Sequence, residues 1–109
     1  MNQDKLSGLI GLCRRAGQLS LGTDTVLRQL KSGCCAAVLM DASAAPNTAK
    51  RLNDAAQQAQ IPVLTLPEGL LDRAAGQSGR IAAALRKGSL ASQILLMFET
   101  AGQALKPID

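Results

Sequence analysis

Apolar residues in the first third of the chain follow two different periods. Over residues 5–16 they recur every three or four positions, which predicts an amphipathic helix. Residues 18–21 alternate between apolar and polar, as a short strand does. A second amphipathic helix is predicted to begin at Thr23 or Asp24 and to end by residue 33, where Ser-Gly interrupts the pattern. The order helix, strand, helix is therefore expected at the start of the chain.

The rest of the chain continues the same alternation. The predicted elements are a strand over 36–40, a helix over 47–60, a strand over 61–66, a short helix over 67–75, a loop over 76–79, a strand over 80–85 and a helix over about 89–100. Helices and strands that alternate in this way predict an α/β fold, a three-layer α/β/α sandwich around a mostly parallel sheet. The residues from Gly102 on are expected to fray.

Length and composition limit the function classes that remain open. The chain has 109 residues, which predicts one domain over 1–109 with a core over about 5–100. Phe98 is its only aromatic residue. Single-strand RNA binders of the RRM and OB types stack bases on exposed aromatic rings, so those modules are excluded.

The ionisable residues favour a polyanionic partner and exclude a structural metal. Twelve Lys and Arg against eight Asp and Glu give a net charge of +4, which suits RNA but also an ordinary soluble protein. Cys13, Cys34 and Cys35 are odd in number and no histidine accompanies them, so neither a disulfide framework nor a zinc site is expected. No cofactor is expected either. The absence of an export leader or a long apolar run predicts a cytoplasmic protein without membrane contact.

A glycine turn is the first candidate site. Gly22 and Thr23 stand between the short strand and the second helix, and a helix start leaves backbone N–H groups that suit phosphate. The nearby basic residues are Arg14, Arg15, Arg28 and Lys31. The alternative is that Thr23 and Asp24 only cap a helix, and that Asp24 pairs with Arg28 four residues on.

Several local sequences and their order resemble the ribosomal protein L7Ae superfamily of kink-turn RNA binders, and within it the small bacterial YlxQ-type branch. The resemblance rests on GLIGLCRRAG at 8–17, GTDTVLR at 22–28, VLMDAS at 38–43, NT at 47–48, IPV at 61–63 and GQSGR at 76–80. It implies a four-stranded mixed sheet between helical layers and binding of a structured RNA, ribosomal or of another ribonucleoprotein. It implies no catalysis.

The resemblance also assigns residues to RNA contacts. In that family the turn corresponding to Gly22 and Thr23 enters the kink, where an Asn and a Glu read guanines of sheared G·A pairs and a Lys meets the backbone or a guanine. Asp24, Thr25 and Arg28 occupy those positions here. Asp24 accepts but donates nothing and Thr25 is shorter than Glu, so a shifted or relaxed RNA preference is expected.

The family's second RNA contact is a loop before the last strand, often apolar. Here that loop is Gly76-Gln77-Ser78-Gly79-Arg80, which is polar and basic. Its backbone amides, Ser78 and Arg80 are expected to hold phosphate or sugar instead of packing on an unstacked base.

Two other functions remain open from the sequence. The chain is alternatively a protein-interaction module of a ribonucleoprotein or of a transcription or translation assembly, because part of the RNA-reading set is missing. A nucleotide-binding domain ranks last, since neither GxGxxG nor a P-loop is present. Asp41 and Ser43 follow a strand, where α/β enzymes keep catalytic groups, but no second carboxylate or histidine accompanies them, and Ser43 is expected to turn the chain.

Overall fold

The computed structural model describes residues 2–100. Its elements are α1 (Gln3–Arg15), β1 (Leu19–Leu21), α2 (Thr23–Ser32), β2 (Cys35–Asp41), α3 (Pro46–Ala59), β3 (Val63–Leu66), α4 (Leu70–Ala75), β4 (Ala82–Arg86) and α5 (Ser89–Thr100). Every element that the periodicity predicts is present. The short helix begins at Leu70 instead of Pro67, and the last strand at Ala82 instead of Arg80. The prediction for the residues from Gly102 on lies outside the described part.

The four strands form one mixed sheet in the order β1-β4-β2-β3. Of the three neighbouring pairs only β2 and β3 are parallel, while β4 is antiparallel to both β1 and β2. The mixed sheet that the resemblance implies is therefore confirmed, and the mostly parallel sheet that the alternation predicts is wrong. The reason lies in α4, whose six residues span only about 9 Å. Because α4 is too short to return the chain to the opposite edge, β4 starts where β3 ends and runs backwards.

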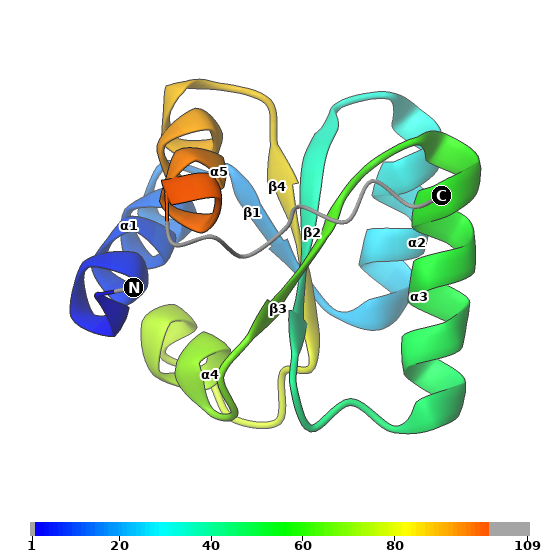
Figure 1. The fold of residues 1–109 in the computed structure, drawn as a ribbon, viewed down its shortest axis with the longest axis horizontal. Coiled ribbons are helices and arrows are strands. Elements are labelled where there is room, and N and C mark those ends of the chain that lie inside the picture. The colour runs from blue at the N-terminus through cyan, green and yellow to red at the C-terminus, as the bar shows by residue number, and fades with distance from the viewer. Residues whose placement is uncertain (1, 101–109) are drawn as a thin grey trace.

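Helices cover both faces of the sheet (Figure 1): α1, α4 and α5 lie on one face, and α2 and α3 on the other. Two apolar clusters fill the spaces between the layers. Successive β2 residues point to opposite faces, so Ala37 and Leu39 enter the first cluster while Val38 and Met40 enter the second. Both sets are buried, which is why this strand appears as one continuous apolar run in the sequence.

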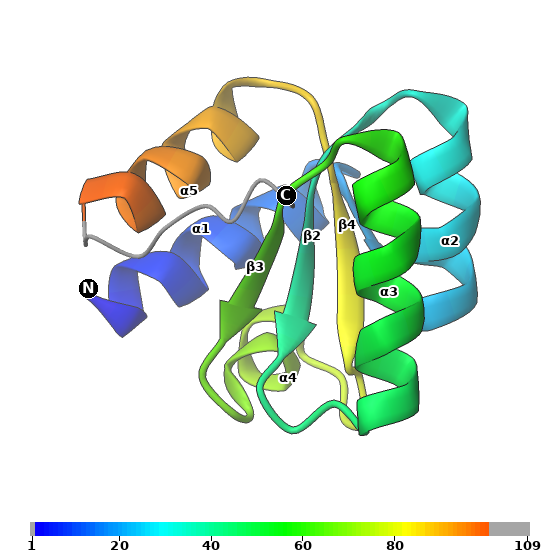
Figure 2. The same ribbon diagram turned by 45° about the vertical axis from the view of Figure 1, so that its right-hand side comes forward.

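One edge of the sheet gathers the elements that the sequence marks as functional (Figure 2). The strands β1, β2 and β3 end there at Leu21, Asp41 and Leu66, β4 begins there after Ile81, and α2 and α3 start there. We call it the carboxyl edge. Two backbone hydrogen bonds join its loops, from Asp41 N to the Ile81 carbonyl oxygen (2.7 Å) and from Ala42 N to the Leu66 carbonyl oxygen (2.9 Å).

Candidate functional site

The Gly22 turn depends on the absence of a side chain. Gly22 has φ +107° and ψ 144°, a conformation that L residues rarely adopt, and its N–H donates to the Ala82 carbonyl oxygen at 2.9 Å. The first hydrogen bond of α2 runs from Val26 N to the Gly22 carbonyl oxygen. The turn therefore redirects the chain from β1 into α2 while staying attached to β4.

The amino end of α2 has no side-chain cap, because its N-cap residue is Gly22 itself. The side-chain cap that the alternative assigns to Thr23 and Asp24 is therefore wrong, while Asp24 does stand in the first turn of α2, where the helix dipole favours its charge. Within residues 2–100 no hydrogen-bond partner is found for the N–H groups of Thr23, Asp24 and Thr25. These three amides stand at the positive end of the helix dipole, where an anion is favoured.

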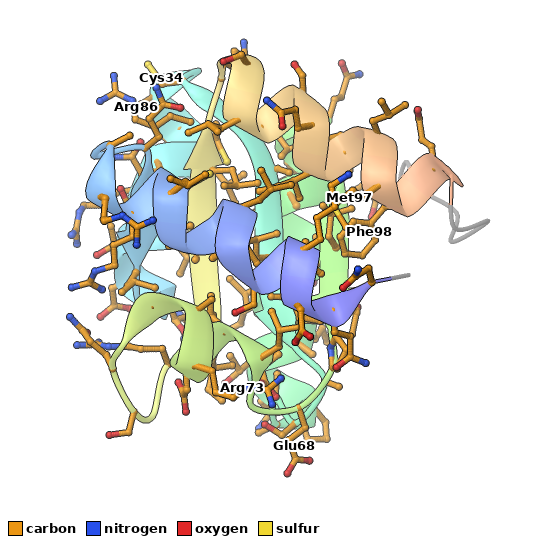
Figure 3. All side chains as sticks on the ribbon, turned by 90° about the vertical axis from the view of Figure 1, so that its left-hand side faces the viewer. Cys34, Glu68, Arg73, Arg86, Met97 and Phe98 are labelled. Carbon is orange, nitrogen blue, oxygen red and sulfur yellow. The ribbon has the colours of Figure 1, made fainter. Side chains whose placement is uncertain are left out.

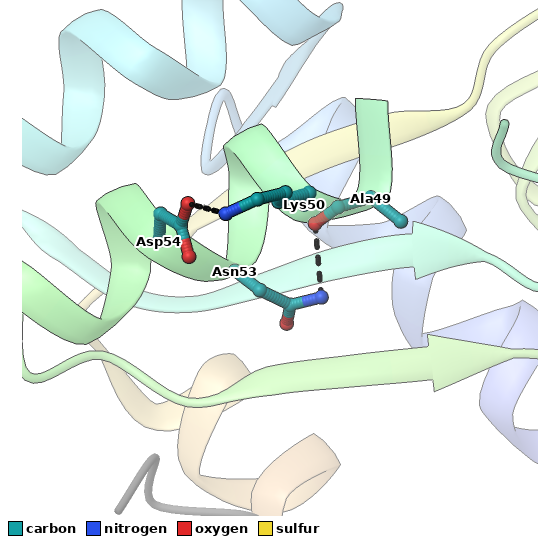
Figure 4. Close-up of polar contacts among 4 residues, drawn as sticks. All are labelled: Ala49, Lys50, Asn53 and Asp54. Atoms are coloured by element: carbon teal, nitrogen blue, oxygen red, sulfur yellow. Dashed lines mark hydrogen bonds and ion pairs between the residues drawn. The ribbon is translucent and has the colours of Figure 1, made fainter. Parts of the chain in front are cut away.

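Arg28 folds back toward this helix start. Its Nη2 donates to Thr25 Oγ1 at 3.2 Å, so the hydroxyl of Thr25 orients the guanidinium. Asp24 and Arg28 are both exposed and do not form an ion pair; in the described part of the chain the one ion pair joins Lys50 and Asp54 at 2.9 Å on α3 (Figure 4). Asp24 thus keeps both carboxylate oxygens available.

The loop after α4 is organised around Asp72. The Asp72 carbonyl oxygen accepts from Gly76 N and Gln77 N, at 2.9 and 3.2 Å. Its carboxylate accepts from Gly79 N (Oδ2, 3.1 Å) and from Arg80 N (Oδ1, 2.8 Å). Asp72 therefore occupies the backbone amides of Gly76, Gln77, Gly79 and Arg80, and the expectation that these amides hold phosphate is wrong. The amide of Ser78 has no hydrogen-bond partner among the described residues.

Besides the Ser78 amide, the available donors of this loop are side chains. Arg80 Nε donates to Gln77 Oε1 at 2.9 Å, and both terminal guanidinium nitrogens of Arg80 lack a partner among the described residues. Ser78 is exposed at the tip. The loop therefore presents one oriented cation and one hydroxyl, without an apolar platform.

The structure separates the other two basic residues of the predicted site. Arg15 lies where α1 packs against α4. A Cβ added to Gly11 would lie 3.6 Å from Arg15 Nη1 and 3.4 Å from the Ala74 carbonyl oxygen, so both groups border the same point. Arg15 thus reaches the end of α4, where the loop begins.

Lys31 lies in the last turn of α2, about 12 Å along the helix axis from Thr23. It borders a groove of about 350 Å³ between α2 and α3, whose other lining residues are Leu27, Leu30, Ala55, Gln58 and Ala59. The predicted grouping of Lys31 with the Gly22 turn is not what the fold produces.

Asp41 is a structural residue of the carboxyl edge, with only 3% of its surface exposed. Its Oδ1 accepts from the N–H and the hydroxyl of Ser43 (2.8 and 2.6 Å), and its Oδ2 accepts from Gly69 N (2.9 Å). Burial by itself raises the pKa of this carboxyl, but the bonds from Ser43 and Gly69 outweigh it and lower the pKa. Ser43 turns the chain, as expected.

Sequence reasoning assigned no role to Asp72 or Gly69. Asp72 lies inside α4 and its carboxylate bonds amides seven and eight residues on, beyond the reach of the local turn patterns by which an Asp is recognised. Asp41 and Gly69 are 28 residues apart, and no local pattern connects them.

The three cysteines are free thiols. Cys13 and Cys35 are buried, and burial raises the pKa of each thiol. Cys34 is exposed beside Arg86, at the end of the molecule opposite Glu68 and Arg73 (Figure 3). Among residues 2–100 no cluster of three or more potential metal ligands occurs. No helix in that range has the length and apolar character needed to cross a membrane.

The comparisons with known proteins agree with this architecture. Residues 4–96 match the ribosomal protein L7Ae/L30e/S12e/Gadd45 family. The chain is 25% identical over 92 residues to the RNA-binding protein YlxQ of Bacillus subtilis (strain 168), covering 84% of this chain and 92% of that protein.

Two solved structures share the fold. A protein of unknown function from Bacillus halodurans C superposes with a TM-score of 0.82 at 27% identity, covering 87% of this chain and 97% of that chain. A 15.5 kD RNA binding protein of Giardia lamblia superposes with a TM-score of 0.76 at 19% identity, covering 96% and 91%, and supports the fold alone.

Proposed function

Because the chain belongs to the ribosomal protein L7Ae/L30e/S12e/Gadd45 family, we propose that it is an RNA-binding protein without catalytic activity, and that it binds folded RNA with the carboxyl edge of its sheet. The similarity to YlxQ, which is named an RNA-binding protein, supports this function. The net charge of +4 also favours a polyanion.

The hydrogen bond from Gly22 N to the Ala82 carbonyl oxygen is the observation that carries the proposal. Leu21 pairs with Ala83 in the same ladder, so the start of α2 and the loop before β4 lie side by side. A single RNA element then meets both the uncapped amides with Arg28 and the guanidinium of Arg80. Neither feature alone distinguishes this protein from many others, but their adjacency makes one continuous contact surface.

We propose that the preferred RNA is a kinked internal loop, read less strictly than by relatives with Asn and Glu at the two reading positions. Asp24 is free to accept from guanine N1–H and N2–H, and Arg28 to donate to guanine O6 and N7 or to a phosphate. Thr25 acts through Arg28, because its hydroxyl already accepts from that guanidinium. Arg80 and Ser78 contact the sugar-phosphate backbone.

The wider setting that we propose is a ribosome or another ribonucleoprotein in the cytoplasm, with residues 1–109 acting as a single domain. The groove between α2 and α3 favours a second candidate function, docking of a protein partner. Its floor is apolar and lies on the face away from α1, α4 and α5. The experiment below separates the two candidates.

The test is a titration of the purified protein with a kink-turn RNA and with the same duplex lacking the internal loop, each at two salt concentrations. The proposal expects tighter binding to the kinked RNA at both concentrations, since base contacts persist where phosphate contacts are screened. Equal binding to both RNAs that disappears at the higher salt contradicts the kink preference and leaves a general basic surface. Binding to neither RNA contradicts RNA binding and favours the protein-docking function.

A further inference from the structure

The loop between α4 and β4 needs an external restraint to keep one conformation. Gly76 and Gly79 both have positive φ, +68° and +77°, and glycine loses more backbone freedom on ordering than any other residue. Gly76, Ser78, Gly79 and Arg80 are exposed. Packing against the core therefore contributes little to the loop's order.

Asp72 supplies the restraint through four hydrogen bonds. Its carbonyl oxygen accepts from the first two loop residues and its carboxylate from the last two, so both ends of the loop are tied to one residue. The residue itself is held firmly, because Leu70, Leu71 and Ala75 of the same helix are buried in the core. A half-buried carboxylate on a packed helix thus fixes an exposed loop.

Arg80 is the side chain that this arrangement aims. Its backbone N–H donates to Asp72 Oδ1 and its Nε donates to Gln77 Oε1, so the side chain is restrained at both ends, while its two terminal nitrogens have no partner among the described residues. Ordering an arginine before it binds reduces the rotamer entropy lost on binding. Charge alone argues against an acidic residue here, since a carboxylate repels phosphate.

From these contacts we infer that Asp72 is a positioning residue of the RNA site: it holds the loop so that Arg80 meets an RNA phosphate in a ready geometry. The inference rests on the proposed RNA binding and assigns a role to an acidic residue within it. Asp72 touches no RNA in this arrangement, and its effect passes through the backbone of Gly79 and Arg80.

The experiment is a double-variant cycle in RNA binding. Asp72→Ala, Arg80→Ala and the combined variant are titrated with the kink-turn RNA, and Asp54→Ala is the control, because it removes an exposed carboxylate on α3. We expect Asp72→Ala and Arg80→Ala each to weaken binding roughly tenfold, as for loss of one charged hydrogen bond. The combined variant is expected to bind no more weakly than Arg80→Ala, and each of the three to lower the magnitude of the salt slope by about 1.

The direction of the change in RNA affinity distinguishes a positioning role of Asp72 from a simple effect of its negative charge. Removing a negative charge strengthens RNA binding by Coulomb's law alone, and Asp54→Ala is expected to leave binding unchanged or slightly tighter. A gain in affinity for Asp72→Ala, or losses that add in the combined variant, would overturn the inference while RNA binding stands. If the unaltered protein binds neither RNA at either salt, the proposed function fails and the inference fails with it.

A second measurement reports on the loop in the free protein. Amide hydrogen exchange at Gly79 and Arg80 is expected to accelerate at least tenfold in Asp72→Ala, because both amides lose their acceptor. If Asp72→Ala does not fold, Asp72→Asn replaces it: Asn keeps one acceptor oxygen, and a smaller loss in the same direction is expected. Unchanged exchange rates in a folded variant would overturn the inference.

Discussion

Gly22 and Ala82, sixty positions apart in the chain, share a hydrogen bond of 2.9 Å from the Gly22 N–H to the Ala82 carbonyl oxygen. This bond extends the ladder between β1 and β4 by one residue beyond the Leu21–Ala83 pair. It places the start of α2 against Ala82, the second residue after the loop at 76–80. Two segments that would otherwise be separate basic patches thereby share one edge of the sheet.

Substituting glycines is expected to have opposite effects at two positions. Gly22→Ala should destabilise the protein by about 1–3 kcal/mol, because φ +107° is strained for alanine. Gly8→Ala should stabilise it by about 0.5–1 kcal/mol, since Gly8 lies inside α1 and a Cβ there meets nothing within 4 Å. Urea unfolding of both variants measures the two effects. Equal stability of the two variants would contradict the role of Gly22 in the turn.

Arg28 and Lys31 allow a matched comparison on one helix. Arg28→Ala is expected to weaken binding of the kink-turn RNA by about 1–3 kcal/mol, because it removes the guanidinium that Thr25 orients at the helix start. Lys31→Ala removes the same charge from the far end of α2 and should weaken binding of the kink-turn RNA less. Fluorescence titration at one salt concentration gives both values. Equal losses would mean that total charge, and not the position of Arg28, governs binding.

Asp41 gives the protein a pH-dependent contribution to stability. The folded-state pKa is lowered from 3.8, so the contribution is fully present above that value and is lost as the pH falls through the lower folded-state pKa. Asp41→Asn places an amide NH2 donor opposite the N–H groups that donate to Asp41. It should lower the free energy of unfolding by about 1–3 kcal/mol at neutral pH. The difference from the parent should shrink below pH 3.8 in thermal or urea unfolding. A difference that stays constant to lower pH would show that ionisation of Asp41 does not contribute.

The three cysteines are expected to differ in reactivity. Cys34 is exposed, whereas Cys13 and Cys35 are buried and have raised pKa values, so little thiolate forms at either buried position. Ellman's reagent should therefore titrate one thiol per folded chain rapidly and the other two only after unfolding. Cys34→Ser should abolish the rapid phase; a rapid phase that persists in that variant would contradict the burial of Cys13 and Cys35.

The order of the elements follows from local physics, and the sequence alone predicts it well. The helical period in α1 and α2 and the apolar run of β2 reflect which side chains each element must bury, and those requirements are written in neighbouring residues. The same patterns do not indicate whether a strand runs parallel or antiparallel to its neighbours. β4 has as apolar a sequence as a parallel strand, and its reversal depends on the length of α4 and on where β3 ends.

The features of the candidate site likewise fall into those that the sequence indicates and those that only the tertiary structure shows. The Gly22 turn was recognisable from glycine, threonine and the nearby basic residues, whereas the RNA-contacting role of the loop at 76–80 was implied by the family resemblance. Their adjacency, the distance of Lys31 from them, and the capture of the loop amides by Asp72 depend on how separate helices pack on the sheet. Such contacts join residues that are distant along the chain, and they form only when all the helices pack on the sheet. Side-chain periodicity in the sequence shows which residues are buried but not the partner against which each is buried.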